Sequence, residues 1–201
     1  MLIVFDLMDT LLTDPYRQAH EAASGLGFAE FDSLRPPGAY HRLERGEISE
    51  GEYWRSIRES GIAFDVDVFH TVRRQGYRWL PGMRELVADC AAVYRTVVGS
   101  NYPDWITEIG RDFLTGLGVD VYASYRFGVR KPSADFFLML CEQSGVTPEE
   151  LVLVDDKPGN TAAVLALGGR GITFTSAPQA RELLGLAGET PRACRPRRGP
   201  G

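Results

Sequence analysis

The chain contains few cysteines and no long uncharged segment. Its three cysteines, Cys90, Cys141 and Cys194, are widely spaced and odd in number, which excludes a disulfide framework and a zinc-ligand pattern. The longest uncharged run, residues 158–169, is far shorter than the roughly 18 residues of a membrane-spanning helix. Only a short apolar segment precedes Asp6, so we find no secretory leader and expect a cytoplasmic protein.

Positive charge is also scarce. Lys and Arg together number 22 against 27 Asp and Glu, which gives a formal net charge of −5 at pH 7. Several arginines gather in the Pro/Gly-rich residues 191–201, which we expect to form a disordered basic tail. This balance argues against a nucleic-acid partner, and no membrane partner is expected. The oligomeric state is left open.

Five short apolar runs recur along the chain. Continuous apolar runs without alternation are typical of strands buried on both faces of a parallel sheet. They lie at residues 2–5, 96–98, 119–123, 151–154 and 172–174. Helix-length segments separate them at residues 81–92, 103–117, 133–144 and 160–167. This alternation predicts an α/β fold with a doubly wound parallel sheet and a Rossmann-like core.

Residues 14–80 interrupt the alternation. Apolar residues recur there at helical spacing and no buried strand is evident, which predicts an all-helical insertion after the first strand. The expected helices lie at residues 16–26, 37–45, 49–60 and 65–77. Ser49 and Glu52 have the spacing of a capping box for the third of them. We therefore expect residues 1–13 and 81–190 to form the core domain and residues 14–80 to form a helical cap.

Polar residues follow three of the predicted strands. Asp6 follows the first, Ser100 and Asn101 follow the second, and Asp155 and Asp156 follow the fourth. In an open α/β sheet, ligands bind at the carboxyl ends of the strands, so these side chains should meet. Convergent carboxylates repel one another unless a cation lies among them, and a few oxygen ligands are typical of Mg²⁺.

The chain has only two lysines, and each adjoins a proline in a loop-like segment. They are Lys131 in Gly-Val-Arg-Lys-Pro and Lys157 in Asp-Asp-Lys-Pro-Gly. An ammonium at Lys131 would hold an anionic substrate and an aspartate nucleophile together by charge. The residues alone thus predict metal-assisted chemistry on a phosphate-like group with an aspartate nucleophile.

These segments resemble the haloacid dehalogenase superfamily. The resemblance covers about residues 1–175, and residues 14–80 occupy the position of the family's helical cap. Four segments look like the four family motifs, in the family's order and spacing: Phe5-Asp-Leu-Met-Asp-Thr-Leu11, Ser100-Asn101, Gly128-Val-Arg-Lys-Pro132, and Val154-Asp-Asp156 followed by Asn160.

The resemblance implies a nucleophile and a metal site. Asp6 would be the nucleophile, forming an aspartyl-phosphate and binding Mg²⁺. The backbone carbonyl of Met8 and the carboxylate of Asp156 would complete the site, with Asp155 helping directly or through water.

The resemblance also implies a substrate site. Ser100 would bind the transferring group with Asn101 beside it, and Lys131 would neutralise charge on that group and on the nucleophile. From the residues alone, helix capping is an alternative role for Ser100 or Asn101, and it is the role that we expect for Asn160.

The sequence departs from the family pattern at Met8. Family members that hydrolyse phosphate esters carry an acid at this position, which protonates the leaving alcohol and later activates water. Asp9 is adjacent, but neighbours in an extended segment point in opposite directions. Since general acid–base catalysis contributes about 10²–10⁴-fold, alkyl phosphates should turn over poorly.

Three functions remain. The first is a Mg²⁺-dependent phosphatase, a phosphoric monoester hydrolase, that acts on a small phosphorylated metabolite through Asp6. The second is a catalytically weak or inactive binding protein that keeps the fold. The third is a 2-haloacid dehalogenase, in which halide leaves without a proton. Those dehalogenases work without metal, so the Asp155-Asp156 pair argues against the third.

The helical insertion would set the choice of substrate. Tyr40, His41, Trp54 and Arg78 are possible contacts there. Aromatic residues at helical spacing are more often part of a hydrophobic core, so Trp54 in particular is expected to pack inside the insertion with Tyr53 and Ile57.

Overall fold

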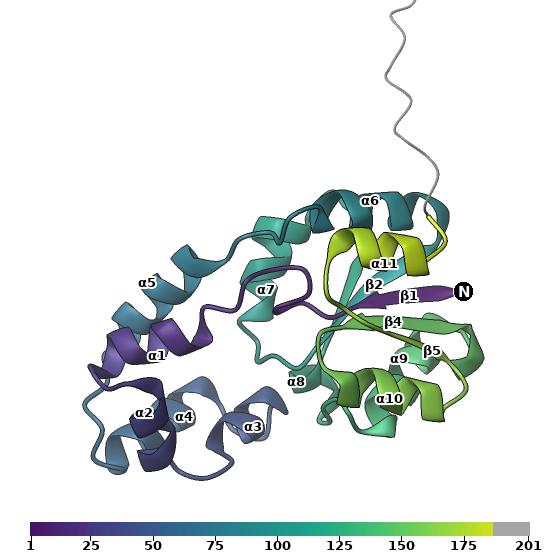
Figure 1. The fold of residues 1–201 in the computed structure, drawn as a ribbon. Coiled ribbons are helices and arrows are strands. Elements are labelled where there is room, and N and C mark those ends of the chain that lie inside the picture. Colours follow the sequence, from purple (N-terminus) through teal and green to yellow (C-terminus); the bar gives the residue numbers. More distant parts are fainter. Residues whose placement is uncertain (187–201) are drawn as a thin grey trace, which may run out of the picture.

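Five parallel strands form the centre of the computed structural model, which describes residues 1–186 (Figure 1). The sheet has the order β3-β2-β1-β4-β5, so β1 lies in the middle, paired with β2 and β4. All five predicted strands are present: β1 (Leu2–Phe5), β2 (Arg95–Ser100), β3 (Asp120–Ala123), β4 (Leu151–Asp155) and β5 (Arg170–Thr173). The doubly wound α/β fold is confirmed.

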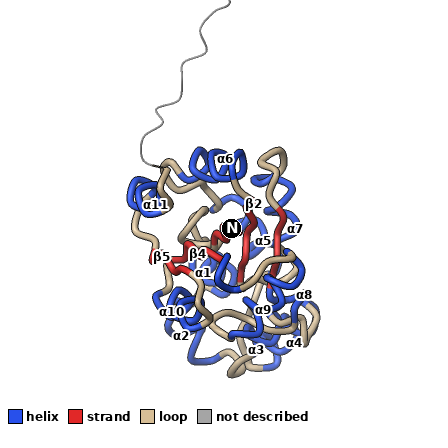
Figure 2. Tube along the Cα trace, turned by 90° about the vertical axis from the view of Figure 1, so that its right-hand side faces the viewer, coloured by secondary structure: helices blue, strands red, loops and turns tan. Residues whose placement is uncertain are grey.

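Helices cover both faces of the sheet, and Figure 2 views the strands from their ends with helices above and below. Successive side chains of a strand point to opposite faces. Leu2 and Val4 therefore pack with α9 and α10, whereas Ile3 and Phe5 face the cluster that includes α6 and α11. These helices are α6 (Met83–Val93), α9 (Ala134–Ser144), α10 (Pro158–Ala166) and α11 (Ala177–Leu183).

The helix predicted at residues 103–117 is shorter in the structure and only partly α-helical. It consists of α7 (Ile106–Ile109), which continues as a π-helical turn at Gly110–Leu114. Glycine is a poor helix former, and Gly110 and Gly116 fall within the predicted span. Three short helices were not predicted: α2 (Phe28–Leu34), α8 (Ser124–Phe127) and α11.

Residues between β1 and α6 form helices that lie beyond the carboxyl ends of the strands (Figure 1). They are α1 (Tyr16–Ser24), α2, α3 (Ala39–Glu44), α4 (Glu50–Glu59) and α5 (Val66–Gly76). The capping box is confirmed, because the Ser49 amide donates to the Glu52 carboxylate at 2.7 Å and the Glu52 amide donates to the Ser49 hydroxyl. The division at residues 13 and 80 stays a prediction.

The interior of these helices is aromatic. Phe31, Tyr53 and Phe69 are fully buried and Trp54 nearly so, as the helical spacing predicted for Trp54. His20 lies among them, with its ring centroid 4.6 Å from that of Phe31. Burial lowers the pKa of His20 to about 4, so this imidazole is a neutral part of the core.

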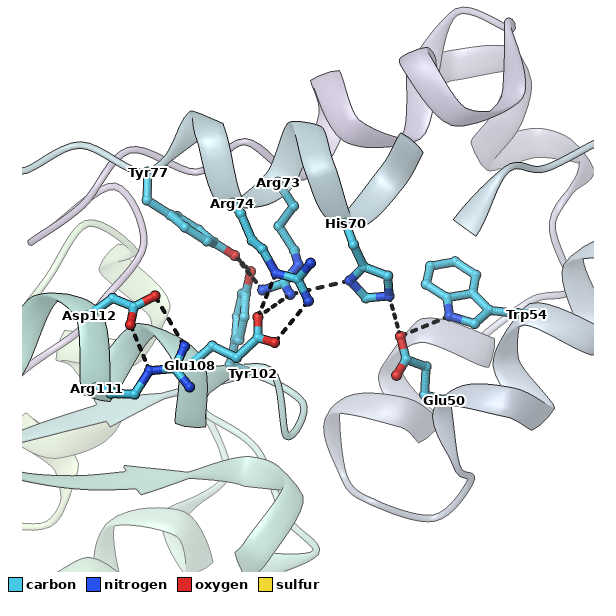
Figure 3. Close-up of polar contacts among 10 residues, drawn as sticks. All are labelled: Glu50, Trp54, His70, Arg73, Arg74, Tyr77, Tyr102, Glu108, Arg111 and Asp112. Carbon is cyan, nitrogen blue, oxygen red and sulfur yellow. Dashed lines mark hydrogen bonds and ion pairs between the residues drawn. The ribbon is translucent and has the colours of Figure 1, made fainter. Parts of the chain in front are cut away.

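A polar network joins α5 to α7 (Figure 3). The buried Arg73 donates to the Glu108 carboxylate at 2.8 Å and to the Tyr77 hydroxyl at 3.1 Å. The exposed Arg74 donates to the other Glu108 oxygen at 2.9 Å. The Tyr77 hydroxyl lies 2.6 Å from that of Tyr102, so the network extends into the core. These contacts fix the helical insertion against the sheet domain.

The two cysteines within residues 1–186, Cys90 and Cys141, are buried free thiols. Burial raises the pKa of Cys90 to about 12. Cys194 and the predicted basic tail at residues 191–201 lie outside the described residues. Within the described chain, no helix combines the length and the apolar character needed to cross a lipid bilayer.

Candidate active site

A cavity of about 240 Å³ lies between the carboxyl ends of the strands and the helical insertion. Five of the seven residues predicted to catalyse the reaction or to bind substrate or metal line it together: Asp6, Met8, Ser100, Asn101 and Lys131. The remaining lining residues are Asp14, Tyr16, Tyr40, Glu44, Tyr102, Arg130, Pro132, Lys157 and Asn160. The parallel sheet thus brings together side chains that are far apart in the sequence, as expected.

Lys131 lies between two carboxylates at the bottom of this site. Its ammonium nitrogen is 2.7 Å from Asp6 Oδ1 and 2.6 Å from Asp155 Oδ2, and its side chain is only 1% exposed. Burial alone would lower the pKa of Lys131, but the two carboxylates outweigh it and the pKa is raised. Burial raises the pKa of Asp6 to about 6 against the attraction of Lys131.

Asp155 is saturated with hydrogen bonds. Its Oδ1 accepts from the Lys157 amide and from Asn160 Nδ2, both at 2.9 Å. Its Oδ2 accepts from Lys131 and again from Asn160 Nδ2. Asp155 is fully buried and both of its oxygens accept hydrogen bonds, so it positions Lys131. It has less free acceptor capacity for a metal ion than Asp6 and Asp156 have.

The expectation that Asn160 caps a helix was wrong. Helix α10 begins at Pro158, whose fixed φ suits the first helical position, and Lys157 precedes it as the cap residue without a side-chain cap. Asn160 lies in the first turn and is buried, so its side chain is free to reach back to Asp155.

Three carboxylate oxygens in the site are buried and have no hydrogen-bond partner among the described residues: Asp6 Oδ2, Asp156 Oδ1 and Glu44 Oε2. Glu44 Oε2 is paired with the Arg130 guanidinium at 3.0 Å, whereas Asp156 Oδ1 lies 3.7 Å from the exposed Lys157 ammonium. Oxygens of Asp6, Asp155 and Asp156 all lie within 4.8 Å of one another. Unpartnered buried carboxylate oxygens are costly, and a hard divalent cation would satisfy them. These residues therefore fit Mg²⁺.

Ser100 is the last residue of β2 and Asn101 follows it, and neither caps a helix. The residue before α7 is Trp105, and no side chain caps that helix. Asn101 Oδ1 accepts from the Lys131 amide at 2.7 Å and its Nδ2 donates to the Lys131 carbonyl at 2.8 Å. Asn101 thus holds the Lys131 segment in place, while the buried Ser100 lines the cavity beside it.

Met8 and Asp9 face in different directions, as the sequence analysis expected. Met8 is buried and lines the cavity, whereas Asp9 is exposed and does not. Asp9 adopts a φ of 57° where the chain turns, and its amide donates to the Leu12 carbonyl at 2.7 Å. The Asp9 carboxylate therefore does not replace the acid that is missing at position 8.

Only one of the four predicted contacts from the helical insertion lines the cavity. Tyr40 does so; Trp54 packs in the aromatic core, and His41 and Arg78 are exposed. Five lining residues were not predicted from the sequence: Asp14, Tyr16, Glu44, Tyr102 and Arg130. Arg130 adjoins Lys131, which is a signal that was available, but nothing in the sequence shows that α1 and α3 bring their residues to this cavity.

Two acids among these unpredicted residues, Asp14 and Glu44, have raised pKa values. Burial raises the pKa of Asp14 to about 6. Burial also raises the pKa of Glu44 to about 7, although Arg130 Nε lies 3.0 Å from its Oε2. Both acids can therefore exchange a proton near neutral pH.

Comparison with known proteins shows relatives across most of the chain. The chain is 31% identical over 182 residues to flavin mononucleotide hydrolase 1 of Arabidopsis thaliana chloroplasts, an alignment that covers 88% of this chain and 73% of the relative. It is 28% identical over 158 residues to a sesquiterpene phosphatase of Aspergillus oryzae, covering 65% of this chain and 76% of the relative. No family model matches the chain.

Solved structures share the fold. A predicted HAD-like hydrolase from Porphyromonas gingivalis aligns with a TM-score of 0.75 and 25% identity over 91% of this chain and 97% of that one. A HAD-family enzyme from Bacteroides thetaiotaomicron, in complex with magnesium and inorganic phosphate, aligns at 0.74 with 19% identity over 87% and 94%. The L-2-haloacid dehalogenase of Xanthobacter autotrophicus aligns at 0.62 with 21% identity over 92% and 82%.

Proposed function

The chain belongs to the haloacid dehalogenase superfamily and is a phosphatase-like hydrolase, and from that premise we propose that it is a Mg²⁺-dependent phosphatase acting through an aspartyl-phosphate at Asp6. One observation carries this proposal. Asp6 holds one oxygen against the Lys131 ammonium at 2.7 Å, and its other oxygen is buried beside Asp156 without a partner. This arrangement suits a nucleophile that shares a cation with its substrate.

Each residue has a defined task in this reaction. A carboxylate oxygen of Asp6 attacks phosphorus, the bond to the leaving oxygen breaks, and water then cleaves the aspartyl-phosphate to release phosphate. Lys131 keeps the nucleophile ionised and attracts the phosphate, and Ser100 donates a hydrogen bond to it. Asp6, Asp156 and the Met8 carbonyl would hold Mg²⁺, which supplies positive charge against the phosphoryl oxygens when bound.

The cavity supports a small organic phosphate as substrate. Its volume of about 240 Å³ and its three tyrosines leave room for a compact leaving group beside the phosphate. The two relatives named above are a flavin mononucleotide hydrolase and a sesquiterpene phosphatase, and both names describe phosphorylated organic substrates. The class that we propose is a phosphate monoester of a small metabolite.

Met8 supports one competing function, a binding protein with little or no turnover. It provides no proton where an alcohol must leave, and the fold and metal site would persist without catalysis. The haloacid dehalogenase function is disfavoured. The unpartnered oxygens of Asp6 and Asp156 fit a bound metal ion, which halide displacement does not use.

The Asp6→Asn variant tests the nucleophile. An amide has nearly the same volume as a carboxylate but neither attacks phosphorus nor binds Mg²⁺ well, so we expect at least a ~10³-fold loss of phosphatase activity with the fold intact. Turnover of a phosphate-ester panel is measured with Mg²⁺ and with EDTA, beside the exposed control Asp112→Asn. The acid-quenched wild type should gain the mass of one phosphoryl group.

Three results would contradict the proposal. Activity retained by Asp6→Asn would exclude this nucleophile. Release of halide from a 2-haloacid in EDTA would favour the dehalogenase. No turnover and no phosphoryl adduct in the wild type would favour the binding protein.

A further inference from the structure

Expulsion of an alcohol requires a proton, and the residue at position 8 has none to give. Met8 lines the cavity with a thioether, and Asp9 faces away from it. An alkoxide is a poor leaving group, so an alkyl phosphate needs another acid within reach. The cavity must supply that acid if the chain hydrolyses such esters.

The lining side chains offer few candidates. Burial raises the pKa of Tyr16, Tyr40 and Tyr102 well above the usual value, so these hydroxyls are weak acids. Two carboxyl groups remain apart from the nucleophile, those of Asp14 and Glu44. Both line the same cavity as the Asp6 nucleophile.

We propose that Asp14 is the general acid and base of this site, taking the place of the acid that is missing at position 8. This inference rests on the proposed phosphatase function. The same loop carries Met8 and Asp14: it turns at Asp9, Leu12 forms a bridge with Met8, and the chain returns to the cavity at Asp14. The two side chains therefore reach the same cavity from one short segment.

Hydrogen bonds fix the Asp14 carboxyl group through one of its two oxygens. Its Oδ1 accepts from the Tyr16 amide at 3.0 Å, and its own amide donates to Asp9 Oδ1 at 3.3 Å. Its Oδ2 has no hydrogen-bond partner among residues 1–186, so this oxygen is available to a leaving group or to water. A carboxyl that is fixed at one oxygen and open at the other is arranged for proton transfer.

Glu44 is committed elsewhere. Its Oε2 is buried and faces Arg130 Nε at 3.0 Å, and its backbone carbonyl accepts a hydrogen bond from the Ser124 hydroxyl. This residue links α3 to the segment before Lys131. We therefore assign Glu44 to positioning Arg130 and keep it as the competing acid in the test.

The surroundings of Asp14 favour proton exchange near neutral pH. Burial is the largest cause of its raised pKa of about 6, and Asp9 and Asp156 add repulsion while Lys157 and the Tyr16 amide oppose the rise. The charge of Asp14 is also felt by the hydroxyls of Tyr40, Tyr77 and Tyr102, whose pKa values it helps to raise. An acid with this pKa both gives and takes a proton at working pH.

The two steps balance. In the first, Asp6 attacks phosphorus, the P–O bond to the alcohol breaks, and the protonated Asp14 carboxyl gives its proton to the departing oxygen. In the second, the Asp14 carboxylate takes a proton from water, the resulting hydroxide attacks phosphorus, and the bond to Asp6 breaks. Alcohol and phosphate have left, one water has been consumed, and Asp14 is protonated again.

The test compares leaving groups. We measure kcat/KM for an alkyl and an aryl phosphate at saturating Mg²⁺ in the wild type, in Asp14→Asn and Glu44→Gln, and in the exposed control Asp112→Asn. Asp14→Asn should lose ~10²–10³-fold on the alkyl ester and less than ~10-fold on the aryl ester, whose leaving group needs little protonation. In Asp14→Asn the pH profile of the alkyl reaction should lose its alkaline limb, the fall in rate above about pH 6 as Asp14 loses its proton, and should keep the acidic limb that reports ionisation of Asp6.

Two further measurements separate catalysis from structure. Met8→Asp combined with Asp14→Asn should regain at least ~10-fold on the alkyl ester, because a carboxyl returns to the same cavity. Asp14→Ser, which keeps an oxygen to accept from the Tyr16 amide, should show the same split between esters as Asp14→Asn. Thermal unfolding of both variants is followed in parallel, and Asp14→Ser carries the test if Asp14→Asn does not fold.

The outcomes distinguish the two proposals. Equal losses on both esters, or a leaving-group split in Glu44→Gln instead, would overturn the role of Asp14. Activity that Asp6→Asn abolishes and both Asp14 variants retain would overturn it as well while leaving the phosphatase function in place. Activity that survives Asp6→Asn would overturn the function itself.

Discussion

Adjacent residues of one type have opposite tasks in this site. Asp155 is saturated by Lys131, Asn160 and a backbone amide, whereas Asp156 has a buried oxygen without a hydrogen bond. The difference follows from strand geometry, since successive side chains at a strand end point in opposite directions. One carboxylate therefore fixes the lysine and the other is left for a cation.

Lys131→Arg should lose most activity although it keeps the charge. Lys131 is 1% exposed and fits between Asp6 and Asp155 at 2.7 and 2.6 Å, where a longer planar guanidinium does not fit without displacing them. We expect a fall in kcat of ~10²-fold or more and a loss of about 1–3 kcal/mol in the free energy of unfolding. Steady-state kinetics and urea denaturation check this, and wild-type turnover would contradict it.

Side chains at strand ends could be predicted to meet, and those placed by tertiary packing could not. Asp6 and Ser100 meet at the cavity as expected, because parallel strands end at one edge, and Lys131 joins them from the loop between α8 and α9. Glu44 was missed because its place depends on how α3 packs over that edge, and Asp14 because its loop turns back to the cavity only in the folded chain. No local pattern encodes such packing, and burial, which gives these acids their raised pKa values, appears only in three dimensions.

Local chemistry also decides where helices begin and end. Ser49 begins α4 with the capping box read from the sequence, whereas Pro158 begins α10 two residues before the expected start. The segment after Trp105 forms only α7 and a π-helical turn, since Gly110 weakens the α-helical continuation. Strands were the more predictable elements, because a run buried on both faces leaves a continuous apolar signal.

Glu108 on α7 should contribute most to the contact between α5 and α7. Arg73 is buried, so Glu108→Ala leaves an uncompensated charge inside the protein and should cost about 2–4 kcal/mol of unfolding free energy (Figure 3). Arg74→Ala removes the exposed partner of the same carboxylate and should cost about 0–1 kcal/mol. Urea denaturation midpoints compare them, and equal effects would show that burial of Arg73 is not decisive.

At the scale of the whole molecule, stability and metal binding are linked through buried acids. Burial raises the pKa of Asp6 and Asp14 to about 6 and that of Glu44 to about 7. At pH values between the ordinary pKa of a carboxyl group and these raised pKa values, the native state holds more protons than the unfolded chain. The free energy of unfolding therefore falls as the pH rises through this range. His20 acts in the opposite sense, because its pKa is lowered to about 4 and the unfolded chain takes up its proton first. Burial also raises the pKa of Asp104 and Asp156 and lowers that of the exposed His41, so five acids against two histidines leave a net fall.

The metal-free protein should therefore unfold at a lower temperature near pH 8 than near pH 5, and Mg²⁺ should narrow that difference. At the proposed site the cation would bind the ionised carboxylates of Asp6 and Asp156, so it would compete with protons at low pH and offset their repulsion at high pH. At a hundredfold excess over its dissociation constant, Mg²⁺ adds about 2.7 kcal/mol. Thermal unfolding in EDTA and in Mg²⁺ at both pH values measures the effect, and Glu44→Gln should flatten the pH dependence in EDTA while the Mg²⁺ increment near pH 8 persists. A metal-free protein that is more stable near pH 8 than near pH 5 would show that the buried acids do not hold their protons as described. A Mg²⁺ increment that is equal at both pH values would show that the cation does not bind the ionised carboxylates.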